Sequence, residues 1–246
     1  MLLRHERAAD ETPPHPLYLI VAETQAEIGA LLTAELQAAT RREAVCIVTH
    51  VTVAADDPAL DEPTKPVGPF YPEEQAGQLA RERGWKLVSE EERGARRVVP
   101  SPRPLEVVEL NAVRLLVEAG TITVACGGGG IPCVRRGNRL HGIDAVIDKD
   151  LSTAVLARGL GAEQLVILTD VPALYRAFGT REQEEIRSLT SEEAARLAPD
   201  LPAGSMRPKL EAAAEFARES RGEVLIASPD ALGPALGGRA GTRIVP

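Results

Sequence analysis

The stretch that decides the fold is Thr121-Ile122-Thr123-Val124-Ala125-Cys126-Gly127-Gly128-Gly129-Gly130. Its first part, Thr121 to Cys126, is an apolar run that predicts a buried strand. Four glycines follow, and glycine lets backbone N–H groups approach an anion closely and adopts positive φ angles easily. A glycine run at the carboxyl end of a strand is where an open α/β sheet binds its ligand. The stretch therefore predicts either a loop that binds phosphate or carboxylate, or a plain flexible turn.

Strands and helices alternate on both sides of this stretch. Further strands are predicted at residues 44–51, 164–168, 223–227 and 242–245, and helices at 105–117, 149–158 and 206–220. Capping-box patterns indicate helix starts at Thr24 and Thr190, and Arg136 to Arg139 is typical of a hairpin turn. We therefore expect an α/β fold, a three-layer αβα sandwich with a mainly parallel sheet, over a single domain at 1–246.

Residues 56–104 interrupt the alternation. This segment is rich in proline and charge, as in Thr64-Lys65-Pro66-Val67-Gly68-Pro69-Phe70-Tyr71. Because structureless loops of this length are uncommon inside compact domains, we expect a small protruding lid subdomain at 56–104, inserted within the main domain.

The composition excludes several classes of protein. The net charge of −8 gives no basic excess for neutralising nucleic-acid phosphates. Cys46, Cys126 and Cys133 form no Cys-x-x-Cys pair and the four histidines lie far apart, so no metal site is predicted and reduced thiols in the cytoplasm are favoured. The apolar runs are too short to cross a bilayer, and the first ten residues lack the apolar core of a signal peptide.

Lysines stand at two predicted helix starts. Lys149 lies within Asp148-Lys149-Asp150, where Asp148 is predicted to cap the helix. Lys209 follows Gly204-Ser205 by about one turn, with Ser205 as the predicted cap. Helix N-termini favour anions, and a lysine there adds to that preference. Each pattern alone also fits an ordinary capped helix with a solvated lysine. Together they predict a site that handles phosphate.

The order of these motifs resembles the amino acid kinase superfamily and, within it, the carbamate kinase family. The resemblance rests on the glycine run, Asp-Lys-Asp at 148–150, Leu-Thr-Asp-Val at 168–171 and Gly-Ser-Met-x-Pro-Lys at 204–209. Residues 64–71 and 96–102 also look like that family's protruding subdomain. Another amino acid kinase, such as acetylglutamate kinase, fits less well because it lacks the segment at 64–71.

The resemblance implies reversible phosphoryl transfer between ATP and carbamate in arginine or other nitrogen catabolism, with Mg²⁺ accompanying ATP or ADP, in a homodimer. It implies that Lys149 and Lys209 stabilise the phosphoryl group, that Asp150 holds the lysines and that Lys65 reaches over the site. It places carbamate, or carbamoyl phosphate, at Gly127, Gly128, Gly129 and Gly130. It lines the nucleotide pocket with Thr169, Asp170, Val171, Tyr175, Ser205 and Met206. Because carbamate is already an anion, no general base is required.

The sequence departs from the family in two respects. The family's motifs Gly-Gly-Asn-Ala and His-Gly-Asn-Gly-Pro-Gln-Val-Gly do not occur in it. We therefore expect a chain that lacks N-terminal strands of the family's domain and has little activity; the alternative is a non-catalytic remnant that binds nucleotide. Arg207 stands where the family has glycine, so it either obstructs phosphate, has no effect or adds a phosphate contact.

Overall fold

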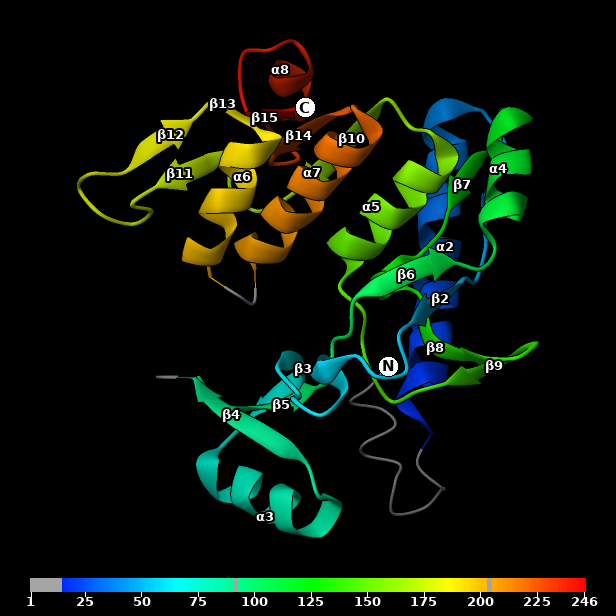
Figure 1. Ribbon diagram of the computed structural model, residues 1–246, viewed down its shortest axis with the longest axis vertical. Coiled ribbons are helices and arrows are strands. Elements are labelled where there is room, and N and C mark those ends of the chain that lie inside the picture. Colours follow the sequence, from blue (N-terminus) through cyan, green and yellow to red (C-terminus); the bar gives the residue numbers. More distant parts are fainter. Residues whose placement is uncertain (1–14, 91–92, 203–204) are drawn as a thin grey trace. The chain divides into compact units, whose positions relative to one another are not determined.

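The computed structural model describes residues 15–90, 93–202 and 205–246 (Figure 1). It divides into two compact units, residues 1–152 and residues 153–246. Helix α5 (Lys149–Leu160) begins in the first unit and ends in the second. Each unit has its own sheets, described below in turn.

The described part of the first unit contains three sheets, of which two have strands in contact with the long helix α2 (Leu17–Thr40). Strand β1 (Ala44–Cys46) pairs in parallel with β7 (Ile122–Val124). A four-stranded sheet has the order β6 (Pro104–Val107), β2 (His50–Val53), β8 (Ile131–Arg136) and β9 (Arg139–Gly142). Helix α2 contacts β1, β7 and β8, and α4 (Leu110–Glu118) contacts β7. The glycine run forms a short 3₁₀ turn, η2 (Gly127–Gly129), between β7 and β8.

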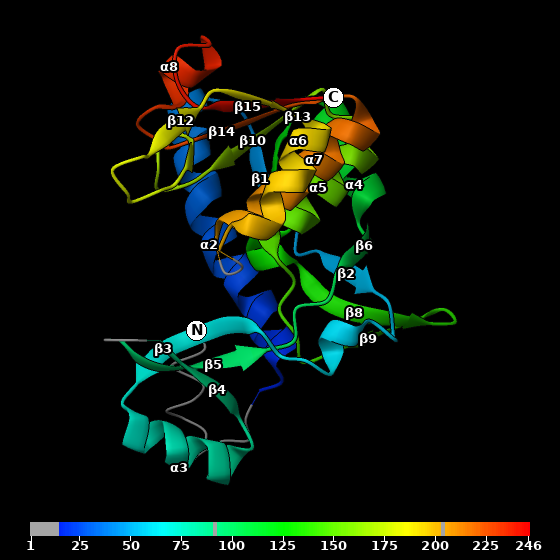
Figure 2. The same ribbon diagram turned by 60° about the vertical axis from the view of Figure 1, so that its left-hand side comes forward.

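The proline-rich segment forms a small sheet of its own. After the turn η1 (Pro58–Leu60), strands β3 (Lys65–Tyr71), β4 (Lys86–Glu90) and β5 (Gly94–Val99) pair antiparallel in the order β3-β5-β4. Helix α3 (Glu73–Arg83) contacts β4 and β5 (Figure 2). Tyr71, Ala76 and Ala95 form a buried apolar cluster with the half-buried Trp85 against it.

The second unit is built on the sheet β10 (Gln164–Leu168), β14 (Glu223–Ala227), β15 (Thr242–Val245) and β13 (Ser188–Thr190). Strands β11 (Leu174–Arg176) and β12 (Glu184–Ile186) form a separate hairpin. Helices α6 (Ser191–Leu197) and α7 (Met206–Ser220) lie side by side in both views, linked by the turn η3 (Ala198–Asp200) (Figures 1 and 2).

Strand β14 lies at the centre of this unit's core. Leu225 and Ala227 pack against Ala235 of α8 (Leu232–Leu236). Because successive strand residues point to opposite faces, Val224 and Ile226 face the other side. Helix α7 also contacts β14, and its Phe216 is fully buried.

Several sequence predictions are confirmed. The α/β class is confirmed, with sheets that mix parallel and antiparallel pairs. The capping box at Thr190 is complete, because its hydroxyl accepts the N–H of Glu193 while the Glu193 carboxylate accepts the N–H of Thr190. The hairpin closes with Arg136 opposite Arg139.

Three element boundaries were predicted wrongly. Helix α2 begins at Leu17 rather than at Thr24, whose hydroxyl donates to the Ile20 carbonyl one turn earlier. The strand predicted at 44–51 is two strands, β1 and β2, with a break between them. The helix predicted at 105–117 begins at Leu110, because residues 104–107 pair with β2 as an edge strand.

Helix α2 is longer than the sequence analysis expected, and this bears on the prediction that no apolar run is long enough to cross a bilayer. It has 24 residues, and its most apolar window reaches a mean hydropathy of 1.2, so by length and composition alone it could span a bilayer. Only 22% of that window is buried. The helix contacts three strands, however, and its Gln25 amide is hydrogen-bonded to the chain before β2, as in a helix packed within a folded domain.

Candidate functional site

The start of helix α5 gathers two lysines and two carboxylates. The Lys149 ammonium donates to both carboxylate oxygens of Asp150, at 2.9 and 3.0 Å. The Lys65 ammonium, from strand β3, donates to Oδ2 of Asp148. Asp148 Oδ1 accepts the backbone N–H groups of Asp150, at 2.9 Å, and Leu151, at 3.4 Å, and so caps α5 as predicted.

Asp148 is a buried carboxylate that remains charged. Burial acts to raise the pKa of Asp148, but the hydrogen bond and charge of Lys65 and the two backbone N–H groups outweigh it. The net effect is a pKa below the ordinary value of 3.8. Lys65 is therefore held beside α5 by a permanent negative charge at neutral pH.

The contacts of these acids add one residue to the predicted set. Asp150 was expected to hold Lys149 and Lys209, and it contacts Lys149. Lys65, for which no partner was predicted, is held by Asp148, which was predicted only as a helix cap. The signal for Asp148 was present in the sequence, because it belongs to the same Asp-Lys-Asp run.

The glycine run is a tightly packed loop rather than a flexible turn. Cys126, Gly128, Gly129 and Gly130 all have positive φ, at 55°, 65°, 105° and 83°. A Cβ on Gly129 would lie 2.1 Å from the carbonyl oxygen of Ile147, and one on Gly130 would lie 2.4 Å from a methyl of Val51. Glycine is therefore required at both positions. The loop lies against the residue that directly precedes Asp148.

A cavity of about 270 Å³ in the second unit brings together six of the predicted residues. It is lined by Thr169, Asp170, Val171, Tyr175, Ser205 and Met206, and also by Ala173, Leu174, Phe178, Leu201 and Pro202. The rings of Tyr175 and Phe178 lie 5.8 Å apart and form an aromatic wall. An apolar cavity with a few polar groups is typical of a site for a small molecule.

Helix α7 carries the remaining predicted lysine. Lys209 lies half-buried in the first turn of α7, three residues after its start at Met206. Gly204 lies outside the described residues, and the Ser205 side chain makes no capping hydrogen bond. The Arg207 guanidinium donates to the backbone carbonyls of Pro199 and Leu201. Arg207 thus holds the chain before α7, a role that none of the three sequence interpretations foresaw.

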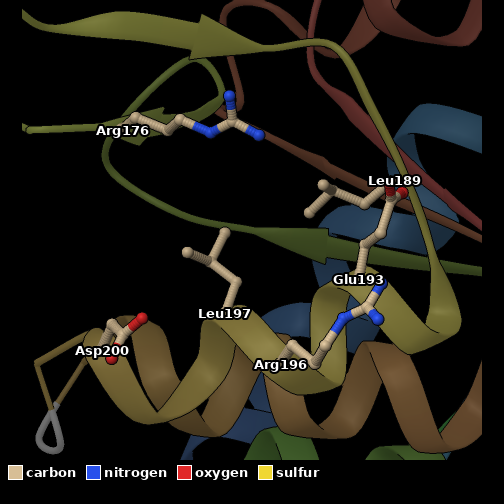
Figure 3. Close-up of a pocket in the computed structure, with 6 residues that line it drawn as sticks. All are labelled: Arg176, Leu189, Glu193, Arg196, Leu197 and Asp200. Carbon is tan, nitrogen blue, oxygen red and sulfur yellow. The ribbon is translucent and has the colours of Figure 1, made fainter.

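A second hollow in the same unit, also about 270 Å³, is shown in Figure 3. It is lined by Arg176, Leu189, Glu193, Arg196, Leu197 and Asp200. Arg176 extends from β11, and Arg196 extends from α6. The hydrogen bond from the Thr190 N–H lowers the pKa of Glu193, whose carboxylate is committed to capping α6. None of the predicted site residues lies in this hollow.

Two buried polar residues were missed by sequence reasoning. Gln25 of α2 is 2% exposed and Thr49, just before β2, is 0% exposed. Their side chains bond to each other, and the Thr49 hydroxyl also accepts the N–H of Cys126, directly before the glycine loop. A glutamine among apolar helix positions was the available signal for Gln25; Thr49 carries no local signal.

The described residues include few groupings of side chains that could bind a metal ion. Over residues 15–90, 93–202 and 205–246, no group of three or more His, Cys, Asp or Glu side chains is placed to hold a metal ion. Magnesium in nucleotide sites is bound mainly by phosphates, waters and one or two carboxylates.

Comparison with known proteins identifies the family. Residues 25–228 match the model of the amino acid kinase family. The chain is 42% identical to a carbamate kinase of Halobacterium salinarum, over 100% of this chain and 80% of the relative. It is also 42% identical to a carbamate kinase of Trichomonas vaginalis, over 96% of this chain and 78% of the relative.

Solved structures agree with this assignment. The carbamate kinase of Giardia lamblia bound to AMP-PNP is 37% identical and superposes with a TM-score of 0.87, over 98% of this chain and 79% of that one. An N-acetylglutamate synthase of Neisseria gonorrhoeae shares only the fold, at 19% identity and a TM-score of 0.52. The chain belongs to the amino acid kinase family and, within it, to the carbamate kinases.

Proposed function

We propose that this chain transfers a phosphoryl group reversibly between ATP and carbamate. The observation that carries the proposal is the start of α5, where Lys149 and Lys65 are each held by a carboxylate, in a chain whose relatives are carbamate kinases. Such an arrangement presents positioned ammonium groups to a phosphoryl group, which is the main requirement of this reaction.

The reaction requires no proton transfer. In one direction, a carbamate oxygen attacks the γ-phosphorus of ATP, and the bond to the bridging oxygen of ADP breaks as the new P–O bond forms. The reverse reaction forms ATP and carbamate from carbamoyl phosphate and ADP. Because the attacking oxygen is already anionic, the protein contributes positioning and charge stabilisation rather than a general base.

Lys149 and Lys209 have the largest proposed share of this stabilisation. An ammonium about 4 Å from a phosphoryl oxygen contributes about 4 kcal/mol at an effective dielectric constant near 20. Loss of one such group therefore lowers the rate on the order of a thousandfold, since about 1.4 kcal/mol corresponds to one decade. Bound Mg²⁺ would neutralise part of the charge on the nucleotide phosphates.

The binding roles follow from the placement of the other residues. The glycine loop, Gly127–Gly130, is proposed to receive carbamate or the carbamoyl group. The cavity that contains Tyr175 and Met206 is proposed to hold the nucleoside of ATP. The segment 56–104, with its own apolar cluster, is proposed to act as a lid that carries Lys65.

We also propose a cytoplasmic homodimer that acts in arginine or other nitrogen catabolism. Free thiols at all three cysteines fit a reducing compartment. Leu31 and Leu32 of α2 are 67% and 45% exposed and offer an apolar surface for a second copy. Analytical ultracentrifugation should give the dimer mass, and Leu31→Glu should shift it towards the monomer.

The test of the reaction is ATP formation from carbamoyl phosphate and ADP by this 246-residue chain. We expect a rate that is proportional to protein concentration, is lost in Lys149→Ala and is lower than that of the Halobacterium salinarum relative assayed alongside. A rate equal to that of the relative would refute the inference that the two absent glycine motifs matter. No ATP formation, together with retained ADP binding, would favour the non-catalytic alternative.

A further inference from the structure

The glycine loop is held by two residues to which no role in the reaction has been assigned. The first is Gln25, whose side chain is buried on a face of α2 that also carries Leu17, Ile20 and Val21. Burying an amide costs free energy unless its hydrogen bonds are made, so a glutamine at this position would destabilise the core if it served only to fill space. Its partners therefore explain its presence.

The Gln25 amide pairs with both backbone groups of Thr49. Gln25 Nε2 donates to the Thr49 carbonyl at 3.1 Å, and Gln25 Oε1 accepts the Thr49 N–H at 3.1 Å. The Thr49 hydroxyl also donates to Oε1, at 3.0 Å. The side chain thus bonds to both backbone groups of one residue, as a neighbouring strand would. Because a carbonyl accepts and an N–H donates, the pairing also assigns the oxygen and nitrogen positions of the amide.

Thr49 in turn bonds both ends of the glycine run. Its Oγ1 accepts the N–H of Cys126 at 2.9 Å, directly before Gly127. Its carbonyl accepts the N–H of Ile131 at 2.9 Å, directly after Gly130. A single fully buried residue therefore fixes the entry and the exit of the loop.

The loop needs such restraint. A non-glycine residue with positive φ, as at Cys126, is strained and persists only where the surroundings impose it. Gly127 also lies against Gln25 itself, because a Cβ there would be 3.4 Å from Gln25 Cγ. Gly129 lies against the carbonyl of Ile147, next to Asp148. Movement of the loop would therefore reach the groups proposed to carry the chemistry.

We propose that Gln25 and Thr49 form a clamp that holds Gly127–Gly130 in the conformation that receives carbamate, which makes both of them positioning residues. This inference rests on the proposed function of the loop. A displacement of about 1 Å in a catalytic site can cost about a hundredfold in rate, so release of the clamp should impair the acceptor side of the reaction. The nucleotide cavity, which is lined entirely by residues 169–206, should be unaffected.

The test uses near-isosteric variants with matched controls. Gln25→Met removes the amide while keeping the side-chain length, and Gln37→Met is its control. Gln37 also lies on α2 and donates to a backbone carbonyl, that of Ala44 at 2.8 Å, but it does not contact the loop. Thr49→Val removes the hydroxyl alone, and Thr49→Ser should restore it.

Kinetics provide the first measurement. For Gln25→Met and Thr49→Val we expect the KM for carbamoyl phosphate to rise at least about tenfold, with the KM for ADP within about twofold of wild type. Gln37→Met and Thr49→Ser should behave like wild type. A general loss of structure would instead raise both KM values or lower the amount of folded protein. Equal KM values in all variants would overturn the clamp.

A second measurement does not depend on turnover. Burial raises the pKa of the Cys126 thiol to about 11, so alkylation of Cys126 in the folded chain should be slow. We expect Gln25→Met and Thr49→Val to speed alkylation of Cys126 and backbone hydrogen exchange at Gly127–Gly130 at least about tenfold, with carbamoyl phosphate slowing both in the wild type.

These two measurements separate the two proposals. Unchanged alkylation and exchange in both variants would overturn the clamp, whatever the activity. Faster exchange in a chain whose wild type forms no ATP, but in which carbamoyl phosphate still protects the loop, would support the clamp and overturn only the proposed reaction.

Discussion

The contact between Lys65 and Asp148 joins strand β3 to the start of α5, and its removal gives the sharpest test of the site. Replacing Asp148 with asparagine keeps the shape of the side chain and an oxygen that can cap α5. It removes the negative charge that faces the Lys65 ammonium. The substitution therefore isolates the ion pair from the helix cap.

The size of the effect follows from burial. The side chains of Lys65 and Asp148 are 25% and 8% exposed. Removing one partner of a buried ion pair costs about 3–5 kcal/mol. Because a quarter of the Lys65 side chain remains exposed, we expect about 2–3 kcal/mol for Asp148→Asn. Asp148→Ala should cost about 1 kcal/mol more, since it also loses the cap of α5.

The pH dependence has a definite sign. The pKa of Asp148 in the folded chain lies below the ordinary value of 3.8, so the folded state prefers the charged form. Its contribution to stability is therefore complete above about pH 4 and is lost as the pH falls through the folded pKa. The difference between wild type and Asp148→Asn should be constant from pH 7 to pH 5 and should shrink below 3.8.

The chain offers its own reporter for this measurement. Trp85 is the single tryptophan, and it packs on the cluster of Tyr71, Ala76 and Ala95 in the segment that carries Lys65. Urea unfolding followed by Trp85 fluorescence, in a cycle of Lys65→Met, Asp148→Asn and the double variant, should give a coupling of about 2 kcal/mol at pH 7. Additivity within about 0.5 kcal/mol at that pH would refute the ion pair as a link between β3 and α5.

Three further predictions concern the loop, the cavity and a helix cap. Gly129→Ala places a Cβ 2.1 Å from the Ile147 carbonyl and should abolish ATP formation, whereas Gly128→Ala meets nothing within 4 Å and should lower thermal stability by only about 1 kcal/mol; equal effects would contradict the loop geometry. Tyr175→Ala should raise the KM for ADP about tenfold and leave that for carbamoyl phosphate unchanged, and the reverse pattern would reassign the cavity. Thr190→Ala should cost about 1 kcal/mol in urea unfolding, and no loss would show that the capping box is not stabilising.

Local signals predicted most of the second unit. The capping box at Thr190 depends on contacts within three residues, and the strand at 223–227 is a continuous apolar run. Sequence patterns predict such features well because the interacting groups are neighbours along the chain. The six residues of the cavity were instead assigned through the resemblance to the carbamate kinase family, and they do line one cavity.

Long-range pairing explains the failures in the first unit. Residues 104–107 resemble the start of an amphipathic helix, but Val107 pairs with Val51, 56 positions earlier in the chain. Thr24 and Glu27 match a capping box, yet the helix has already begun at Leu17. In the first case a contact with a distant strand overrides the local helix propensity. In the second case the helix begins seven residues before the capping-box pattern, so the pattern does not mark its start.

The break in the strand predicted at 44–51 and the clamp on the glycine loop have one cause. Strand β1 pairs with β7, and β2 pairs with β8, so the chain changes partner between Cys46 and His50. The glycine loop joins those same two partners, β7 and β8. Thr49 lies at the change, where its backbone groups bond to Gln25 and Ile131 instead of to a regular ladder.

The four glycines therefore account for only part of the site. They allow a loop with positive φ to lie against Val51 and Ile147, but they provide no force that holds it there. The hydrogen bonds that hold the loop come from Gln25 and Thr49, two buried residues that are 24 positions apart in the chain. For the acceptor role proposed above, the loop has to be ordered before the ligand arrives, because ordering on binding would cost affinity. A preformed anion site is thus expected to combine a visible glycine run with polar anchors that only the fold reveals.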